Sequence, residues 1–285
     1  MGSVMQIRTM RPAEISLAIN WAVIEGWNPG IYDHVPFAAA DPGGFLIGTV
    51  DGQPAAVISA IRYGTGFGFI GCYIVAPEWR GKGYGWQIWQ AAMQRLAGRN
   101  VGLDGVVAQQ ENYRRSGFVL AHANVRHVGK AGADKSWFAD GCALRPLHSE
   151  PMDRIADFDS EFFPNDRRAF LHAWLSQPHA TGQVAIKGGQ IAGYGQIRPC
   201  RSGFKIGPLF ANQPAIAMAL FSALANTVPA GSDIYLDTPA VNSDAMALAE
   251  HFCMTPVFET ARMYTRGEPD IALARTYGIT SFELG

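Results

Sequence analysis

Residues Pro77 to Gly85 read Pro-Glu-Trp-Arg-Gly-Lys-Gly-Tyr-Gly, with glycine at three alternate positions. An apolar run, Phe67 to Ala76, precedes this segment, and an amphipathic run, Trp86 to Leu96, follows it. The pattern predicts a strand, a turn and the start of a helix. Glycines leave the N–H groups of the turn unscreened, and the helix adds the positive end of its dipole. Such a turn is suited to bind an anion such as a pyrophosphate.

The spacing of these glycines differs from that of two other phosphate-binding loops. A dinucleotide-binding turn needs Gly-x-Gly-x-x-Gly, and a P-loop needs Gly-x-x-x-x-Gly-Lys-Ser/Thr. The segment instead resembles the signature of the GNAT superfamily of N-acetyltransferases, in which Arg/Gln-x-x-Gly-x-Gly follows a strand that ends in Val-x-Pro. The matching residues are Val75, Pro77, Arg80, Gly83 and Gly85.

The resemblance implies that acetyl-CoA is the cosubstrate. In that family the amides of the loop bind the pyrophosphate, and the preceding strand diverges from its neighbour so that the pantetheine lies between them. Ile74 and Val75 would then offer backbone groups to the pantetheine and to the acetyl carbonyl. Carried over to this chain, the resemblance assigns CoA binding to Ile74, Val75, Arg80, Gly81, Lys82, Gly83, Tyr84 and Gly85.

Acetyl transfer also needs a proton for the departing thiolate. Tyr113 stands four residues before Gly117-Phe118, which resembles the family's Tyr-x-x-x-Gly-Phe. A phenol with a pKa of about 10 is suited to this donation, so Tyr113 is the predicted acid. A buried tyrosine that only packs its ring on the helix is the alternative. Many family members have asparagine seven residues earlier, where this chain has Val106.

A base for the acceptor amine is marked less clearly. By the resemblance, the acceptor side lies between the first helix and the second strand, where Glu25 and Asp33 are the carboxylates. Glu25, which precedes the aromatic loop Gly26-Trp27-Asn28-Pro29-Gly30, is the predicted base. A solvated charge at a helix end is the alternative interpretation. Asp104, on the fifth strand, is a further carboxylate able to face the cleft.

The same order of elements occurs twice along the chain. From Gln6 to about Val128 we predict a strand, a helical region, a loop over Gly26–Asp41, a hairpin turned at Asp51-Gly52, the strand and helix around the glycine loop, a strand, a short helix and a closing pair of strands. The order returns from Gly141, and a period of roughly 130 to 140 residues indicates duplication. We therefore predict an α+β fold of two tandem GNAT-like domains, residues 1–137 and 138–285, each a mixed α/β sheet flanked by helices.

The second copy departs from the first where the loop should be. Its matching strand is followed by Ala211-Asn212-Gln213-Pro214-Ala215, which contains no glycine. We therefore expect the second domain to bind no CoA and to complete the acceptor pocket instead. The tail Tyr277–Gly285 carries Phe282 and Leu284, and we expect it to dock on the protein.

Composition excludes several other classes of function. A formal net charge of −1 over 285 residues argues against nucleic-acid and membrane-surface partners. The four cysteines form no Cys-x-x-Cys pair, which predicts free thiols in a reducing cytoplasm and no metal site. No apolar stretch approaches the roughly 20 residues that span a bilayer. A monomer or a homodimer fits these features.

These observations predict an acetyl-CoA-dependent N-acetyltransferase. The acceptor would be an amine of a small molecule or of a lysine, and transfer would be direct, within a ternary complex. The alternative is a non-catalytic regulator that binds or senses acyl-CoA without transferring the group. The acceptor itself is not specified by these motifs, because acceptor choice resides in variable loops.

Overall fold

A computed structural model describes residues 4–132 and 137–285. The first half of the chain contains, in order, β1 (Gln6–Thr9), α1 (Ile15–Ile24), α2 (His34–Ala40), β2 (Phe45–Val50), β3 (Gln53–Tyr63), β4 (Phe67–Val75), α3 (Tyr84–Arg95), β5 (Asn100–Val106), α4 (Gln110–Arg115) and β6 (Val119–Lys130). The second half contains β7 (Cys142–Pro146), α5 (Met152–Asp159), α6 (Arg168–Leu175), β8 (Thr181–Lys187), β9 (Gln190–Pro199), β10 (Phe204–Ala211), α7 (Pro214–Ala225), β11 (Asp233–Pro239), α8 (Ser243–His251), β12 (Thr255–Tyr264) and β13 (Thr276–Gly278).

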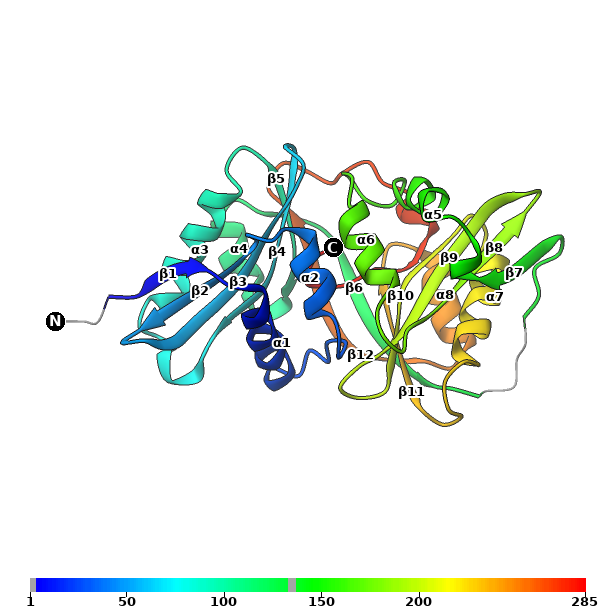
Figure 1. The fold of residues 1–285 in the computed structure, drawn as a ribbon, viewed down its shortest axis with the longest axis horizontal. Coiled ribbons are helices and arrows are strands. Elements are labelled where there is room, and N and C mark those ends of the chain that lie inside the picture. The colour runs from blue at the N-terminus through cyan, green and yellow to red at the C-terminus, as the bar shows by residue number, and fades with distance from the viewer. Residues whose placement is uncertain (1–3, 133–136) are drawn as a thin grey trace.

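The strands of the described residues join in one mixed sheet of 13 strands that runs through both halves of the molecule (Figure 1). The strand order is β1-β2-β3-β4-β5-β12-β6-β11-β10-β9-β8-β7, with β13 paired to β10. Most neighbours are antiparallel, whereas β4 pairs with β5 and β10 pairs with β11 in parallel. The two parallel pairs occupy equivalent places in the two halves, in agreement with the predicted repeat.

The two halves exchange a strand at the centre of the sheet. β12, late in the chain, pairs with β5 of the first half, and β6 of the first half pairs with β11 of the second. β6 and β12 then pair with each other along most of their length. The predicted closing pair of strands in the first half was therefore wrong. A single strand, β6, is present, and its neighbours come from the other half, because strand pairing is decided by contacts remote in sequence.

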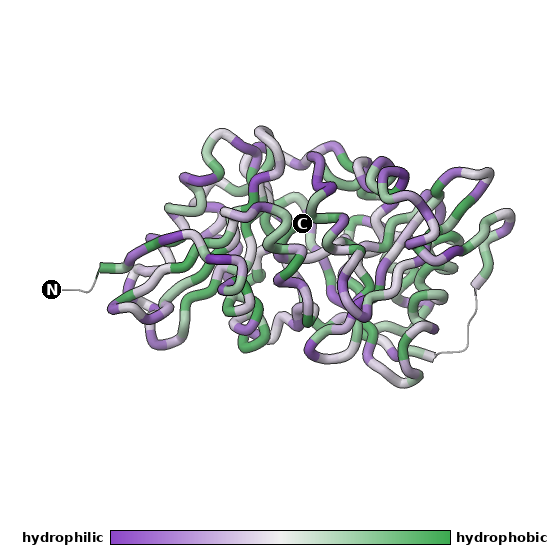
Figure 2. The backbone as a smooth tube through the Cα atoms, viewed as in Figure 1, coloured by the Kyte–Doolittle hydropathy of each residue, from purple (hydrophilic) through white to green (hydrophobic). Residues whose placement is uncertain are grey.

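Both faces of the first half of the sheet are buried. Along β3, Val57 and Ile61 belong to one hydrophobic cluster, whereas Ile58 and Ala60 belong to another on the opposite face. This alternation follows from the two-residue period of a strand. Helices α1 and α2 cover the first face, and α3 covers the second. Figure 2 shows the corresponding hydrophobic colour along the strands of the interior.

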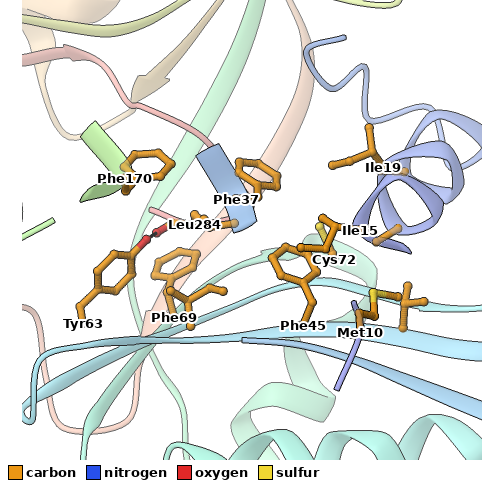
Figure 3. Close-up of a cluster of buried hydrophobic side chains, with 14 of the residues drawn as sticks. Met10, Ile15, Ile19, Phe37, Phe45, Tyr63, Phe69, Cys72, Phe170 and Leu284 are labelled. Carbon is orange, nitrogen blue, oxygen red and sulfur yellow. Dashed lines mark hydrogen bonds between the residues drawn. The ribbon is translucent and has the colours of Figure 1, made fainter. Parts of the chain in front are cut away.

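The first of these clusters also joins the halves. Phe163, Phe170 and Trp174 of the second half pack in it with residues of α1, α2 and β4. Leu284, in the C-terminal tail, is fully buried there, and its carbonyl accepts a hydrogen bond of 3.0 Å from the Tyr63 hydroxyl (Figure 3). The predicted docking of the tail is therefore confirmed, and the C-terminus lies between the two halves (Figure 1).

One predicted loop contains a helix. The segment Gly26–Asp41 was predicted to be a loop, but α2 spans His34–Ala40 within it. Pro36 lies in the first turn of α2, where the missing N–H costs no intrahelical hydrogen bond. Phe37 is fully buried and stacks on Phe45 and Trp174. Tertiary burial therefore stabilises a helix whose local signals favour a loop.

No helix in the described part of the chain has both the length and the apolar character required to cross a membrane.

Candidate active site

The parallel strands β4 and β5 separate part-way along their length. They pair from Phe67 with Asn100 as far as Ile70 with Leu103, and no pairing continues beyond this point. A cavity of about 570 Å³ occupies the gap, which is an ordinary volume for a small-molecule site. Its lining includes Gly71 to Val75 of β4 and Asp104 to Val106 of β5. The expected divergence of the two strands is thus present at the end that meets the glycine loop.

The three glycines of the loop line this cavity for two different reasons. Gly81 and Gly83 have φ values of +74° and +83°, in the left-handed region that disfavours other residues. Gly83 is the residue at the N-terminal cap of α3, so the first free N–H groups of that helix follow it. At Gly85 a side chain would lie 2.7 Å from the Tyr73 hydroxyl. The loop thus leaves open backbone at the positive end of a 12-residue helix.

β4 is irregular where it borders the cavity. Cys72 has a φ of +46°, and the pairing register of β3 with β4 shifts between Val57 and Ser59. A bulge of this kind turns backbone groups out of the regular ladder and commonly occurs next to active sites. Burial raises the pKa of the Cys72 thiol, which keeps it protonated and makes it a poor nucleophile. The strand therefore contributes backbone groups to the cavity rather than a covalent nucleophile.

Arg80 and Glu25 fasten the loop to the rest of the first half. The Arg80 guanidinium donates to the Val75 carbonyl at 2.9 Å and forms an ion pair with Glu25. Both residues line the cavity. Their expected roles, CoA binding by Arg80 and proton acceptance by Glu25, stay predictions. Lys82 and Tyr84 have other surroundings: the Lys82 ammonium lies 4.7 Å from the centre of the Trp79 ring, and Tyr84 is buried in the core.

Tyr113 lies in α4 and lines the same cavity. Its ring packs against Trp89 of α3, at 5.6 Å between ring centres, and against the glycine backbone at Gly105. Burial and the neighbouring Tyr73 raise the pKa of Tyr113 to about 12, so the hydroxyl keeps its proton at neutral pH. Its position in the cavity fits the predicted acid, and its ring packing fits the alternative of a tyrosine that only packs on the helix. The acid role of Tyr113 therefore stays a prediction.

Asp104 faces the cavity but is held by several partners. Arg262 of β12 donates to its two oxygens at 2.9 and 2.6 Å, and Asn124 of β6 donates at 2.7 Å. Asp33, the other carboxylate considered from the sequence, is fully buried and bidentate with Arg198 of β9, at 2.9 and 3.2 Å. Side chains of three strands, β6, β9 and β12, therefore anchor these two carboxylates.

The cavity is completed by residues that sequence reasoning did not assign to it. Phe258 and Thr260 of β12, with Phe282 and Glu283 of the tail, close the side away from the glycine loop. The Phe258 and Phe282 rings lie 6.1 Å apart between centres. Their place could not be read from sequence, because it depends on the strand exchange and on the path of the tail. The apolar character of the tail was the one local signal.

The equivalent gap in the second half is filled. β10 and β11 pair from Phe204 with Ile234 to Ile206 with Leu236, and then β13 pairs with β10 at Leu209 and Phe210. Gly278 of β13 packs so closely that a side chain there would lie 2.7 Å from Leu236. Pro214 begins the following helix in place of a glycine loop. The chain itself therefore occupies the position that corresponds to the first cavity.

No group of three or more His, Cys, Asp or Glu side chains suited to hold a metal ion is found among residues 4–132 and 137–285.

A glycine loop at a helix N-terminus, a cavity between diverging strands and a tyrosine that lines it are the arrangement expected of an acyltransferase that uses acyl-CoA. The family model "Acetyltransferase (GNAT) family" matches residues 17–118, and "Acetyltransferase (GNAT) domain" matches residues 155–278. A holothin acyltransferase of Pseudoalteromonas sp. (strain SANK 73390) is 31% identical over 98% of this chain and 95% of its own length. The chain belongs to the GNAT family and is an N-acyltransferase with two tandem GNAT domains.

Solved structures agree in fold. A putative acetyltransferase from Pyrococcus horikoshii superimposes with a TM-score of 0.82 at 21% identity, over 99% of this chain and 96% of that one. A tandem GNAT protein from the clavulanic acid biosynthesis pathway gives a TM-score of 0.67 at 12% identity, over 98% and 100% of the two chains. At these identities the likeness concerns the fold alone. The predicted tandem α+β fold is confirmed.

Proposed function

We propose that this enzyme transfers an acetyl group from acetyl-CoA to a primary amine of a small molecule, by direct attack within a ternary complex. The observation that carries this proposal is the single continuous cavity that begins at the glycine loop and ends among Phe258, Phe282 and Glu283. A cosubstrate bound along β4 and an acceptor entering from the tail side would meet within it. Holding both reactants in one cavity supports direct transfer.

The proposed cosubstrate site follows the residues expected from the sequence. The amides of Gly81, Gly83 and Gly85 would hold the pyrophosphate, and Ile74 and Val75 would border the pantetheine. Arg80 would support CoA binding indirectly, by holding the loop in its conformation, because its guanidinium contacts the Val75 carbonyl and Glu25. Lys82 and Tyr84 would contribute backbone groups, because their side chains pack elsewhere.

The proposed division between the halves assigns CoA to residues 1–137 and completion of the acceptor side to residues 138–285. The filled gap at β13 supports a second half that binds no CoA. An apolar acceptor is favoured by Trp27, Phe258 and Phe282, which line the cavity. The Arg126 guanidinium lies over the rings of Phe258 and Phe282, at 5.8 and 4.7 Å, and donates to the Trp27 carbonyl. The related holothin acyltransferase is named for holothin and not for a protein acceptor, which supports a small molecule over a protein lysine.

Tyr113 is the proposed acid that protonates the thiolate of CoA. Glu25, predicted from the sequence as the base, lines the cavity, but its pairing with Arg80 also fits a structural role. The non-catalytic regulator considered as an alternative has no support from the family, whose members named above are acyltransferases.

Calorimetric titration with acetyl-CoA and with desulfo-CoA tests the proposal. We expect one site per chain, because the second gap is filled, and similar affinity for both ligands, because the loop binds the shared pyrophosphate. A screen of primary amines monitored by thiol release then tests transfer. Two sites per chain would contradict the division between the halves. Absence of binding would contradict the use of CoA.

A further inference from the structure

The cavity contains three carboxylates, and two of them are engaged. Glu25 forms an ion pair with Arg80, and Asp104 is bidentate with Arg262. Glu283 is 4% exposed, and within the described residues its carboxylate has no hydrogen bond or ion pair. A proton acceptor needs a free lone pair that faces the reactants. Glu283 meets this condition, and the other two carboxylates do not.

Among the buried charges near Glu283, two arginines are paired with aspartates, and one further cation, Lys205, is available to balance the charge of Glu283. Two arginines neutralise two aspartates in the interior between the halves. These pairs are Arg126–Asp237, with Nε 2.7 Å from Oδ1, and Arg198–Asp33, with Nε 2.9 Å from Oδ1. Lys205 of β10 remains; its ammonium donates to the Asn28 carbonyl at 2.9 Å and lies 4.0 Å from Asp237. Lys205 therefore supplies the positive charge that favours an ionised Glu283, without occupying its carboxylate.

Burial raises the pKa of Glu283 above its ordinary value, and the nearby Asp33 acts in the same direction. Lys205, Arg126 and Arg198 oppose this shift. A base is most effective when its pKa approaches the pH at which it acts, so an upward shift of the Glu283 pKa favours its role as a proton acceptor. The titratable and charged groups that act on Glu283 from the surrounding elements are Asp33, Cys72, Arg126, Arg198 and Lys205. Asp237 lies behind them, paired with Arg126 and 4.0 Å from Lys205.

The tail places Glu283 at the acceptor side of the cavity. Its carbonyl packs directly on Gly71 of β4, where a side chain would displace it. Gly71 precedes Val75 by four residues, or about 13 Å of strand. Tyr113 packs on Gly105, which lies two residues beyond Leu103, the last residue of β5 that pairs with β4, and Gly71 directly follows Ile70, the partner of Leu103. A thioester lying along β4 from the loop would thus reach Tyr113 and Glu283 together.

We propose that Glu283 is the general base of the acyl transfer, an inference that rests on the proposed function. The amine nitrogen attacks the thioester carbonyl carbon and forms the C–N bond, while the Glu283 carboxylate takes a proton from that nitrogen. The C–S bond then breaks, and the thiolate takes the proton of the Tyr113 hydroxyl. Solvent returns a proton to Tyr113 and removes the proton from Glu283. The products are the amide and free CoA.

The test compares full-length wild type with Glu283→Gln, Glu283→Asp and Glu25→Gln. The probe reaction is acetyl transfer from acetyl-CoA to 2-phenylethylamine, chosen for the aromatic rings of the acceptor side, followed by thiol release from about pH 6 to about pH 9. Glu259→Gln is the matched control, because Glu259 is an exposed carboxylate on β12 next to Phe258. Calorimetry gives the acetyl-CoA Kd of each variant, and thermal unfolding reports folding.

We expect Glu283→Gln to lower kcat/KM by about 100-fold or more with the Kd for acetyl-CoA unchanged. The acidic limb of the wild-type pH profile should disappear in Glu283→Gln and persist, at a lower rate, in Glu283→Asp. A merely structural role would not produce this difference. Glu259→Gln should match the wild type.

Three results would overturn the inference. Glu283→Gln with kcat/KM within a few-fold of wild type would exclude the base role while leaving the proposed function intact. If Glu283→Gln loses kcat/KM as expected but keeps the acidic limb of the wild-type pH profile, Glu283 has a structural role instead. If the wild type binds acetyl-CoA but transfers to no amine, the proposed function fails and this inference with it.

Discussion

The backbone at Gly83 is the residue-scale feature on which the cosubstrate site depends. Its φ of +83° is accessible to glycine at little cost, whereas an L-residue there is strained by roughly 1–2 kcal/mol. Nothing lies within 4 Å of a side chain built on Gly83, so the strain and not a clash would act. The loop would relax, and its N–H groups would turn away from the ligand.

Gly83→Ala is therefore expected to weaken acetyl-CoA binding by about tenfold or more, which is the equivalent of roughly 1.4 kcal/mol. Calorimetry provides the measurement. Gly52→Ala is the matched control, because Gly52 has a φ of +79° and equally open surroundings but lies in the β2–β3 turn. The control should lose similar stability and keep its affinity. Equal affinities in both variants would contradict the assignment of the loop.

Tyr113 carries the second prediction at this scale. Its pKa of about 12 means that it holds its proton at neutral pH and that deprotonation does not limit the rate until strongly alkaline pH. Tyr113→Phe keeps the ring on Trp89 and removes only the hydroxyl. We expect kcat to fall by about 100-fold, with the affinity for acetyl-CoA retained. Steady-state kinetics check this, and a larger loss in Tyr73→Phe would assign the acid to Tyr73 instead.

At the scale of elements, the structure shows which parts of a sequence determine their own conformation. β2 and β3 meet at the predicted Asp51-Gly52 turn, and the glycine loop with α3 lies where its motif predicts. These elements have strong local signals. α2 was missed because Pro29, Gly30 and Pro36 indicate a loop, whereas burial of Phe37 decides for a helix. The place of Glu283 in the lining of the cavity was missed because it depends on the path of the tail.

The ion pair of Asp33 and Arg198 connects the segment before α2 with β9 and carries the third prediction. Burial alone would raise the pKa of Asp33, but Arg198 and Lys205 hold it below its ordinary value. Arg198→Met leaves this buried carboxylate without its partner, which costs about 3–5 kcal/mol. Urea unfolding at pH 7 should show this loss. Arg168→Met, at a half-exposed arginine, should cost less than about 1 kcal/mol.

The pH dependence distinguishes this mechanism from simple loss of packing. With a depressed folded-state pKa, the wild-type Asp33 contributes stability above its unfolded pKa and loses it as pH falls through the folded value. In Arg198→Met, burial without the cation raises that pKa. The deficit of the variant should then shrink between about pH 7 and about pH 5, as the carboxyl becomes neutral. A deficit that does not change with pH would indicate a packing effect instead.

At the scale of the whole molecule, the two copies of the repeated fold differ at the gap between their parallel strands. The gap between β4 and β5 stays open as the cavity, whereas the gap between β10 and β11 receives β13. The tail continues from β13 to place Phe282 and Glu283 in the open cavity. The segment that closes one site therefore completes the other, which gives a physical reason for keeping both halves in one chain.

The strand exchange predicts that the two halves unfold together. β5 has β12 as its neighbour, β11 has β6, and the pair β6–β12 joins them, so neither half can open without unpairing strands of the other. The cluster that contains Phe37, Trp174 and Leu284 adds apolar contacts across the same boundary. We expect native-state hydrogen exchange in increasing urea to give β3 and β9 the same opening free energy and the same m-value. Opening of β9 at a distinctly lower urea concentration than β3 would show instead that the halves are independent units, and that the exchanged strands act only as a hinge between them.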